Sequence, residues 1–313
     1  MTRLVFIARR LAQLIPVVFG VTLVVFLLIH LVPGDPARTL LGLKASPAAI
    51  AALRHQLRLD QPLPEQYLSF LSGIIHGSLG TSITYGTSTG QLILQRLPAT
   101  MWLLLYATVI AVGISVPLAA AAAAHKNKAI DHLVRLIPLV GLGMPAFWIG
   151  ILFLLAFALT LHIFPVGGYG SGFFGHLRSM FLPALTISVS LTPLLVRSLR
   201  ASLLTILDAD HVVTARAKGL SYQRVLIRHV VRNAVMPTVT VLAINLGFLV
   251  GGTVVVEQVF GIPGLGSLMI NAILTRDFPV VQGVTLTFAV LVVAINLLAD
   301  LSYLLLDPRV KFD

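Results

Sequence analysis

The stretch DADHVVTARAKGLSYQRVLIRHVVRNAVMP, Asp208 to Pro237, is a polar segment between two long apolar runs. The side chain of Asp208 or Asp210 can cap the start of a short helix, which we expect over 211–218. Gly219 follows directly, where a helix commonly ends on a residue with a left-handed backbone. The pattern therefore predicts a short helix that opens a hairpin.

The second half of the stretch predicts another helix, which has Ser221 as its N-cap and runs towards Asn233. Arg224, Arg228 and Arg232 recur at every fourth position and so form one basic ridge. Like charges at this spacing repel each other, so the ridge needs an anionic partner. Lipid headgroups and an acidic protein surface both meet that need.

The rest of the chain is strongly apolar. Of its 313 residues, 57% are hydrophobic and 11% are charged, and the mean hydropathy is +0.97. A soluble domain has about 25% charged residues, so this composition indicates an integral membrane protein. The net charge of +11 would favour nucleic-acid binding in a soluble protein. Here the cations lie in short loops between apolar runs, so we expect membrane lipid and no nucleic acid as their partner.

Six apolar runs are long enough to cross a hydrocarbon core, which takes about 20 helical residues. They are 10–31, 97–124, 133–160, 181–205, 235–256 and 280–306. The first is too long for a signal peptide and no cleavage site follows it, so we interpret it as a retained span. The sequence thus predicts an all-α polytopic membrane protein with six transmembrane helices and a long external loop after the first.

The basic residues predict the orientation of these helices, because cytoplasmic loops carry the excess of Lys and Arg. With a cytoplasmic N-terminus, 15 of the 22 Lys and Arg residues face the cytoplasm and the other 7 face outward. Five of those seven lie in the long external loop, where the rule carries less weight. Both termini and the hairpin are therefore expected in the cytoplasm.

Few polar groups lie in the predicted spans or at their ends. A polar group inside a membrane faces the bundle interior or water, so Asn245, Glu257 and Asp300 are candidates for a substrate path or gate. Gly251 is a further candidate and forms a small-xxx-small pair with Gly247.

For Glu257 and for Asp277, in the connection before the sixth span, the structural alternative is salt bridging or turn capping. For Asp300 it is pairing with an arginine or a backbone donor. In the third span, Pro138 and Pro145 interrupt the helical ladder, which is consistent with a kinked helix lining a path and equally with plain packing.

The sequence lacks the motifs of several enzyme classes. It contains no GxxxxGK[ST] phosphate-binding loop, no HExxH or other close histidine pair, and no GxSxG nucleophile elbow. It also contains no cysteine, which excludes disulfides and thiolate chemistry. We therefore expect a chain that is not an enzyme, has no metal site and binds no cofactor itself.

The hairpin resembles the ATPase-coupling loop of binding-protein-dependent ABC import permeases. The closest match is the first permease subunit of the dipeptide/oligopeptide (peptide/nickel) importer family, whose members read much like TARAKGLS…RHVVRNAVMP here. They also have counterparts of LDQPLPEQY and RLPAT before the second span and of PGLG…RDFPVVQ before the sixth. The resemblance covers about residues 1–311, with these motifs in the same order.

This resemblance implies a type I ABC importer permease fold. The implied domains are 1–31 (cytoplasmic N-terminus and first span), 32–96 (extracytoplasmic cap), 97–306 (transmembrane core with the coupling hairpin 208–237) and 307–313 (cytoplasmic tail). The implied ATPase-coupling residues are Val213, Thr214, Ala215, Arg216, Ala217, Lys218 and Gly219. The wider family starts this helix with Glu-Ala-Ala, which this chain lacks, so no role for an acid there is expected.

The resemblance also implies partners and a location in a bacterial or archaeal plasma (inner) membrane. The partners are a second homologous permease, two ATPase subunits that bind ATP and Mg, and an extracytoplasmic solute-binding protein. Within 32–96, helix-like runs begin after Ser46 and near Glu65. This segment either packs on the bundle or helps to dock the solute-binding protein.

The implied function is ATP-driven import of di- or oligopeptides. Import of a nickel chelate or of glutathione by the same family is the alternative. An ion-coupled secondary transporter would show inverted repeats and charges near the membrane midplane, and a membrane scaffold would move no solute. The coupling hairpin argues against both of these last two classes.

Overall fold

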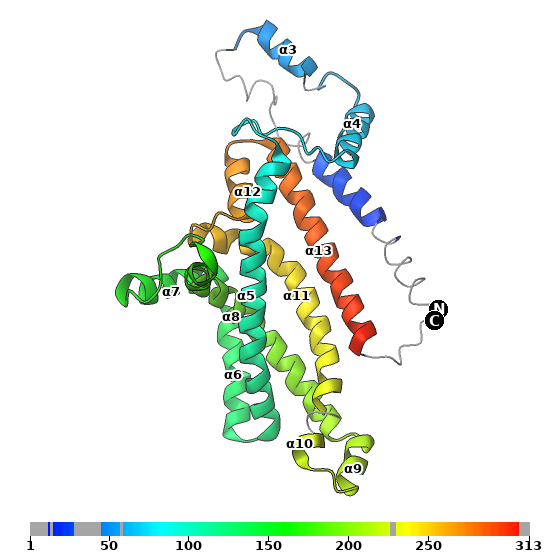
Figure 1. The fold of residues 1–313 in the computed structure, drawn as a ribbon, viewed down its shortest axis with the longest axis vertical. Helices are drawn as coiled ribbons and strands as arrows, with labels where there is room; N and C mark the ends of the chain where they lie inside the picture. Colours follow the sequence, from blue (N-terminus) through cyan, green and yellow to red (C-terminus); the bar gives the residue numbers. More distant parts are fainter. Residues whose placement is uncertain (1–11, 13–14, 28–44, 57–58, 226–229, 307–313) are drawn as a thin grey trace. The chain divides into compact units, whose positions relative to one another are not determined.

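The computed structural model describes residues 12, 15–27, 45–56, 59–225 and 230–306, and the regular elements in these ranges are helical apart from one isolated bridge, Thr81–Ser88 (Figure 1). The labelled elements are α3 (Pro47–Gln56), α4 (Leu63–Ile75), α5 (Thr89–Ala124), α6 (Ala129–Gly143), α7 (Ala146–Phe153), the π-helix η1 (Leu154–Thr160), α8 (Gly172–Leu207), α9 (Asp210–Ala217), α10 (Tyr222–Val225), α11 (Arg232–Val259), α12 (Leu265–Leu274) and α13 (Phe278–Leu306). The predicted all-α class is confirmed.

Within the described residues, four helices are long and apolar enough to cross a membrane: Thr89–Ala124, Gly172–Leu207, Asn233–Val259 and Phe278–Ala299. They correspond to the second, fourth, fifth and sixth predicted spans. The first predicted span is described only in part, as the apolar helix Ile15–Leu27. The predicted cytoplasmic tail 307–313 lies outside the described residues.

The third predicted span is divided into separate helices. Its first part forms α6, and the helix ends before Pro145, which opens α7. Met144 has an extended backbone (φ −114°, ψ 134°) because the ring of the following proline disfavours the helical conformation. The interruption expected at Pro145 is thus present as a break between two helices, whereas α6 continues through Pro138.

The chain divides into two compact units. One comprises Met1–Pro98 and Gly264–Val290, and the other comprises Ala99–Pro263 and Leu291–Asp313. In the first unit the Ser46 hydroxyl accepts a hydrogen bond from the Ala49 N–H at 3.2 Å, which confirms the predicted helix start there. In the same unit the hydroxyls of Thr22 and Tyr67 are hydrogen-bonded at 3.0 Å and join the helix 15–27 to α4.

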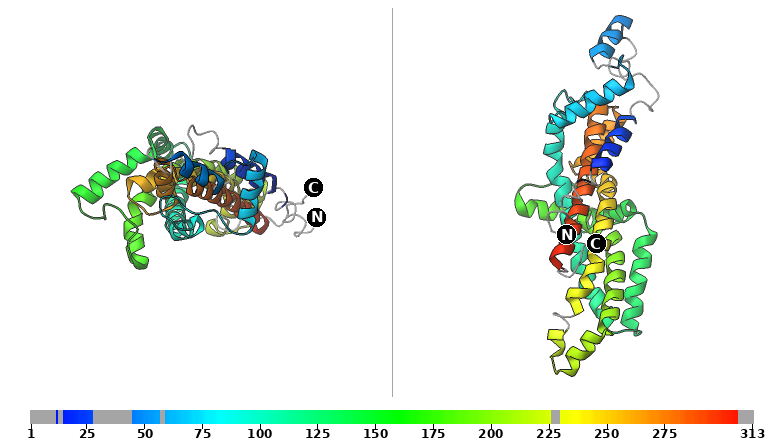
Figure 2. Two further views of the ribbon diagram at one scale, coloured as in Figure 1. Left: turned by 90° about the horizontal axis from the view of Figure 1, so that it is seen from above. Right: turned by 90° about the vertical axis from the view of Figure 1, so that its right-hand side faces the viewer.

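The second unit is built around α8. This helix packs on α6, α7 and α11, and Figure 2 shows α6, α8 and α11 alongside one another. Within its apolar window 72% of α8 is buried, against 22% for α11, so α8 is the centre of this unit. Pro183 and Pro193 lie within α8 without ending it.

Two segments expected to be irregular are helical. The predicted loop 161–180 is irregular only up to Ser171, because α8 already begins at Gly172. The connection before the sixth span contains α12, whose residues Leu265, Leu268 and Ala272 are buried. These apolar residues recur every three or four positions, so packing of one face explains the helix.

Candidate partner-docking hairpin

The hairpin begins where α8 ends. Figure 1 shows α9 and α10 at the end of α8 that lies away from α7. The N–H groups of Val212 and Val213 both donate to the carbonyl of Ala209 and start α9. Asp208 is the C-terminal cap residue of α8, and its carboxylate lies 3.7 Å from Lys126 Nζ.

Gly219 lies just after the end of α9, where the sequence predicts a left-handed residue. Its φ of +77° is in the left-handed region, where glycine avoids the steric cost that a β-carbon brings. The Leu220 N–H reaches back to the carbonyl of Ala215 at 3.3 Å, which satisfies one free carbonyl at the end of α9. The chain can therefore reverse direction immediately after an eight-residue helix.

The two faces of α9 differ in exposure. Val212 and Ala215 are buried in a cluster with residues of α5, α6, α8, α10 and α11. On the other face Thr214, Ala217 and Lys218 are exposed, and 55% of Val213 is accessible. Of the predicted coupling residues, Ala215 thus faces the bundle, whereas Val213, Thr214, Ala217, Lys218 and Gly219 lie on the surface. The side chain of Arg216 lies outside the described residues.

Of the three arginines in the predicted basic ridge, the structure describes the side chain of one. Arg224 lies in α10 and is exposed. Arg228 and the side chain of Arg232 lie outside the described residues. The ridge therefore stays a prediction.

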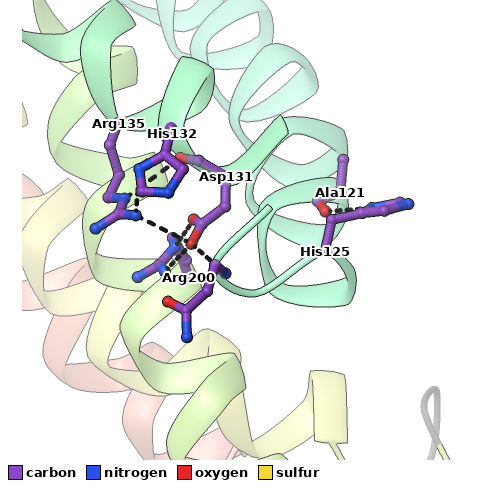
Figure 3. Close-up of polar contacts among 7 residues, drawn as sticks. Ala121, His125, Asp131, His132, Arg135 and Arg200 are labelled. Atoms are coloured by element: carbon purple, nitrogen blue, oxygen red, sulfur yellow. Dashed lines mark hydrogen bonds and ion pairs between the residues drawn. The ribbon is translucent and has the colours of Figure 1, made fainter. Parts of the chain in front are cut away.

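A buried carboxylate lies at the base of the hairpin. Asp131, in the first turn of α6, is 0% exposed and accepts two hydrogen bonds from Arg200 of α8, from Nε to Oδ1 at 2.5 Å and from Nη2 to Oδ2 at 2.7 Å (Figure 3). The Asn127 N–H donates to Oδ2 at 3.0 Å, and Arg135 Nη2 lies 3.4 Å from the same oxygen. This one carboxylate therefore joins the turn between α5 and α6 to both α6 and α8.

Asp131 is held in its charged form. The hydrogen bonds from Arg200 lower the pKa of the Asp131 carboxyl from 3.8 to about 2, against the opposing effect of burial. The Asn127 N–H and the charges of Arg200 and Arg135 act in the same direction as those hydrogen bonds. Asp131 precedes the predicted third span and stays ionised at neutral pH.

Of the other predicted site residues, Asn245, Gly251 and Glu257 lie along α11. The Asn245 side-chain amide donates to the carbonyl of Val241 in its own helix at 2.7 Å, and Gly251 is exposed further along α11. Glu257 is fully buried and accepts a hydrogen bond from the Thr100 hydroxyl at 2.7 Å. The side chain of Asp300 lies outside the described residues. The role of these four residues on a substrate path stays a prediction.

Sequence reasoning did not single out the Asp131–Arg200 pair. The available signal was an arginine inside the predicted fourth span, together with an acid just before the predicted third span. Among the described residues no group of three or more His, Cys, Asp or Glu side chains could hold a metal ion.

Two solved structures share the fold of this chain. A chain of the MetNI methionine ABC transporter in an inward-facing conformation superposes with a TM-score of 0.58 and 15% identity, over 69% of this chain and 97% of that chain. A chain of an amino acid ABC transporter gives a TM-score of 0.52 and 15% identity, over 68% and 92%. At this identity the likeness concerns the fold alone.

Full-length relatives are considerably more similar in sequence. A Brucella abortus protein with a provisional name as a peptide transport system permease is 40% identical over 310 residues, which cover 98% of this chain and 99% of that protein. The oligopeptide transport system permease protein AppB of Bacillus subtilis is 36% identical over 313 residues, with the same coverage. The glutathione transport system permease protein GsiC of Salmonella typhimurium is 36% identical over 307 residues, again covering 98% and 99%.

Family models cover almost the whole length of the chain. Residues 1–104 match the N-terminal part of the membrane components of binding-protein-dependent transport systems. Residues 113–312, which contain the hairpin and the Asp131–Arg200 pair, match the model of the inner membrane component itself. The chain therefore belongs to the family of binding-protein-dependent transport system inner membrane components.

Proposed function

We propose that this chain is a permease subunit of an ATP-driven importer that moves peptides into the cytoplasm, and that α9 is the surface on which a partner ATPase docks. The docking proposal rests on the difference between the two faces of α9, one of which is buried and the other exposed. Val212 and Ala215 anchor the helix, while Val213, Thr214 and Ala217 present a small, partly apolar surface. Small side chains permit close approach of a partner, and Lys218 adds a positive charge at the end of the same helix.

The hairpin is connected so that motion of a partner can reach the membrane spans. The helices that flank it, α8 and α11, are both candidate membrane spans and pack on each other. ATP bound by two partner ATPase subunits, with Mg, would close the ATPase dimer and displace α9. Such coupling works only if ATP favours one of two states of the complex by differential affinity.

The proposed orientation places the termini and the hairpin in the cytoplasm. The excess of Lys and Arg in the segments assigned to that side supports it. The segment 32–96 then lies outside the membrane as a cap, where a solute-binding protein delivers its cargo. A second, homologous permease subunit would complete the transmembrane path.

Peptide is the proposed substrate class because relatives at 36–40% identity carry the names of peptide and oligopeptide permeases. Glutathione is the second candidate because a relative at 36% identity is named as a glutathione permease. A nickel chelate is the third candidate, since nickel importers belong to the wider family that the sequence resembles.

The experiment is a reconstitution of the complex with its own ATPase subunits and solute-binding protein. ATPase activity is measured with binding protein loaded in turn with a dipeptide, an oligopeptide, glutathione or a nickel chelate. We expect stimulation by peptide-loaded binding protein. Stimulation by the nickel chelate alone would contradict the substrate proposal, and a permease that purifies without any ATPase would contradict the docking proposal.

A further inference from the structure

We propose that Asp131 and Arg200 are a positioning pair that fixes the orientation of α9 for the partner ATPase, an inference that rests on the proposed docking function of α9. Neither side chain offers much surface to a partner, since Asp131 is 0% exposed and Arg200 is 18% exposed. The pair acts through α6 and α8: α9 contacts α8 directly, and its buried residues belong to the same apolar cluster as Val134 of α6.

The geometry of the pair constrains direction as well as distance. Two parallel N–H···O bonds, Nε to Oδ1 and Nη2 to Oδ2, hold the planar guanidinium against the planar carboxylate. Such a forked pair fixes the relative rotation of the two side chains, which a single contact does not. The Asn127 N–H donates a further hydrogen bond to Asp131 and so connects the turn between α5 and α6 to the same carboxylate.

The buried face of α9 depends on the helices that this pair joins. Val134, one turn after Asp131, and Leu203, one turn after Arg200, belong to the cluster that also contains Val212 and Ala215. Apolar packing is non-directional, so these contacts hold α9 against the bundle without fixing its angle. The ion pair fixes the positions of α6 and α8, and thereby the shape of the surface that receives α9.

Stability alone does not explain a charged pair at this position. Replacement of a buried ion pair by apolar side chains of similar volume is often neutral or stabilising, because burying both charges costs free energy. A forked hydrogen bond supplies directional geometry that an apolar pair lacks. The neighbouring pair of Lys126 and Asp208 has no such geometry, because both side chains are more than half exposed and the two atoms are 3.7 Å apart.

The absence of cysteine from the chain permits a direct test with two spin labels. Labels at Lys128→Cys, in the turn before α6, and His211→Cys, in α9, both lie at exposed positions outside the predicted coupling residues. In the purified complex we expect one narrow distance distribution between them. In the double variant Asp131→Leu/Arg200→Met we expect the distribution to broaden while the protein stays folded, since the apolar pair replaces both charges. Asp131→Asn is a second variant with the same expected direction.

The matched control is Lys126→Gln, which removes the exposed ion pair of the same turn. It is expected to leave the distance distribution unchanged, because exposed ion pairs contribute little. If Asp131→Leu/Arg200→Met also kept the native distribution, the positioning role would be overturned.

The functional readout uses the same complexes. Peptide-loaded binding protein should stimulate the ATPase of the double variant at least about fivefold less than that of the wild type, the lower end of usual coupling effects. The ATPase subunits should remain bound in wild-type amounts. Unchanged stimulation would overturn the inference. A wild-type permease that binds no ATPase would instead refute the proposed function, and the label distances would still decide whether the ion pair positions α9.

Discussion

Asp131 and Asp277 are both buried aspartates, one in each compact unit, and they have different kinds of partner. Asp131 faces the guanidinium of Arg200, which lies 69 residues further along the chain, and so joins α6 to α8. Asp277 accepts hydrogen bonds from neutral donors in one short turn, the Ser82 hydroxyl at 2.5 Å and the N–H groups of Ile83 at 3.2 Å and Thr84 at 3.0 Å.

The difference shows what each carboxylate can do. Asp277 organises a turn, since its donors are three consecutive residues and the Tyr85 N–H in turn donates to the Ser82 hydroxyl. Its loss leaves neutral groups without partners. Asp131 holds a cation in place, and its loss leaves the charge of Arg200 largely buried and without its main partner. The same residue type therefore stabilises local structure in one unit and helix–helix geometry in the other.

The largest expected effect is the loss of stability in Asp131→Asn, which we compare with that in Asp277→Asn. Asp131→Asn should cost about 3–5 kcal/mol of unfolding free energy, because it breaks a buried ion pair and leaves the other charge in place. Asp277→Asn should cost about 1.5–3 kcal/mol, the usual value of hydrogen bonds to a charged group. Thermal unfolding in detergent measures both. A larger loss for Asp277→Asn would contradict the comparison.

Low pH should narrow the difference in stability between the wild type and Asp131→Asn. The pKa of Asp131 is lower in the folded protein (about 2) than its ordinary value (3.8). The carboxylate therefore contributes its full stabilisation above about pH 4 and loses it as the pH falls towards 2. Unfolding temperatures of both proteins, measured at steps between pH 6 and pH 2.5, should converge. A gap that stays constant down to pH 2.5 would show that the charge of Asp131 is not the source of the difference.

A smaller effect is expected for Ser82→Ala in the first unit. The change removes one of three hydrogen bonds to Asp277 and the acceptor of the Tyr85 N–H, for a cost of about 1.5 kcal/mol. Thr87→Ala, an exposed position in the same turn region, is the control and should be close to neutral. Equal unfolding temperatures for Ser82→Ala and Thr87→Ala would mean that the hydrogen bonds of the Ser82 hydroxyl do not stabilise the protein.

The features that local chemistry determines were the ones that the sequence predicted. Gly219 follows a short helix and adopts the left-handed backbone that such an ending favours, and Ser46 caps α3. For Asp277, turn capping was one of the structural alternatives, and the structure places its carboxylate on the turn 82–84. In each case the deciding information lies in the residue type and its immediate neighbours.

The features that depend on which helices meet were not predictable. Pro145 ends a helix, whereas Pro183 and Pro193 lie within one, buried on the central helix of their unit. The residue type is the same, so packing against neighbours decides the outcome. The Asp131–Arg200 pair likewise requires that α6 lies beside α8, and the apolar pattern of a single sequence predicts spans without predicting their neighbours.

The most direct test of the central claim is a cross-link from α9 to the ATPase in native membranes. Single cysteines are introduced at Ala217, on the exposed face of α9, and at Phe174, which is 82% exposed in the first turn of α8. Helix α8 has 36 residues and so is about 54 Å long, which keeps the two positions apart. The account predicts a cross-linked product with an ATPase subunit from Ala217→Cys and none from Phe174→Cys. A product from Phe174→Cys alone, or from neither position, would contradict it.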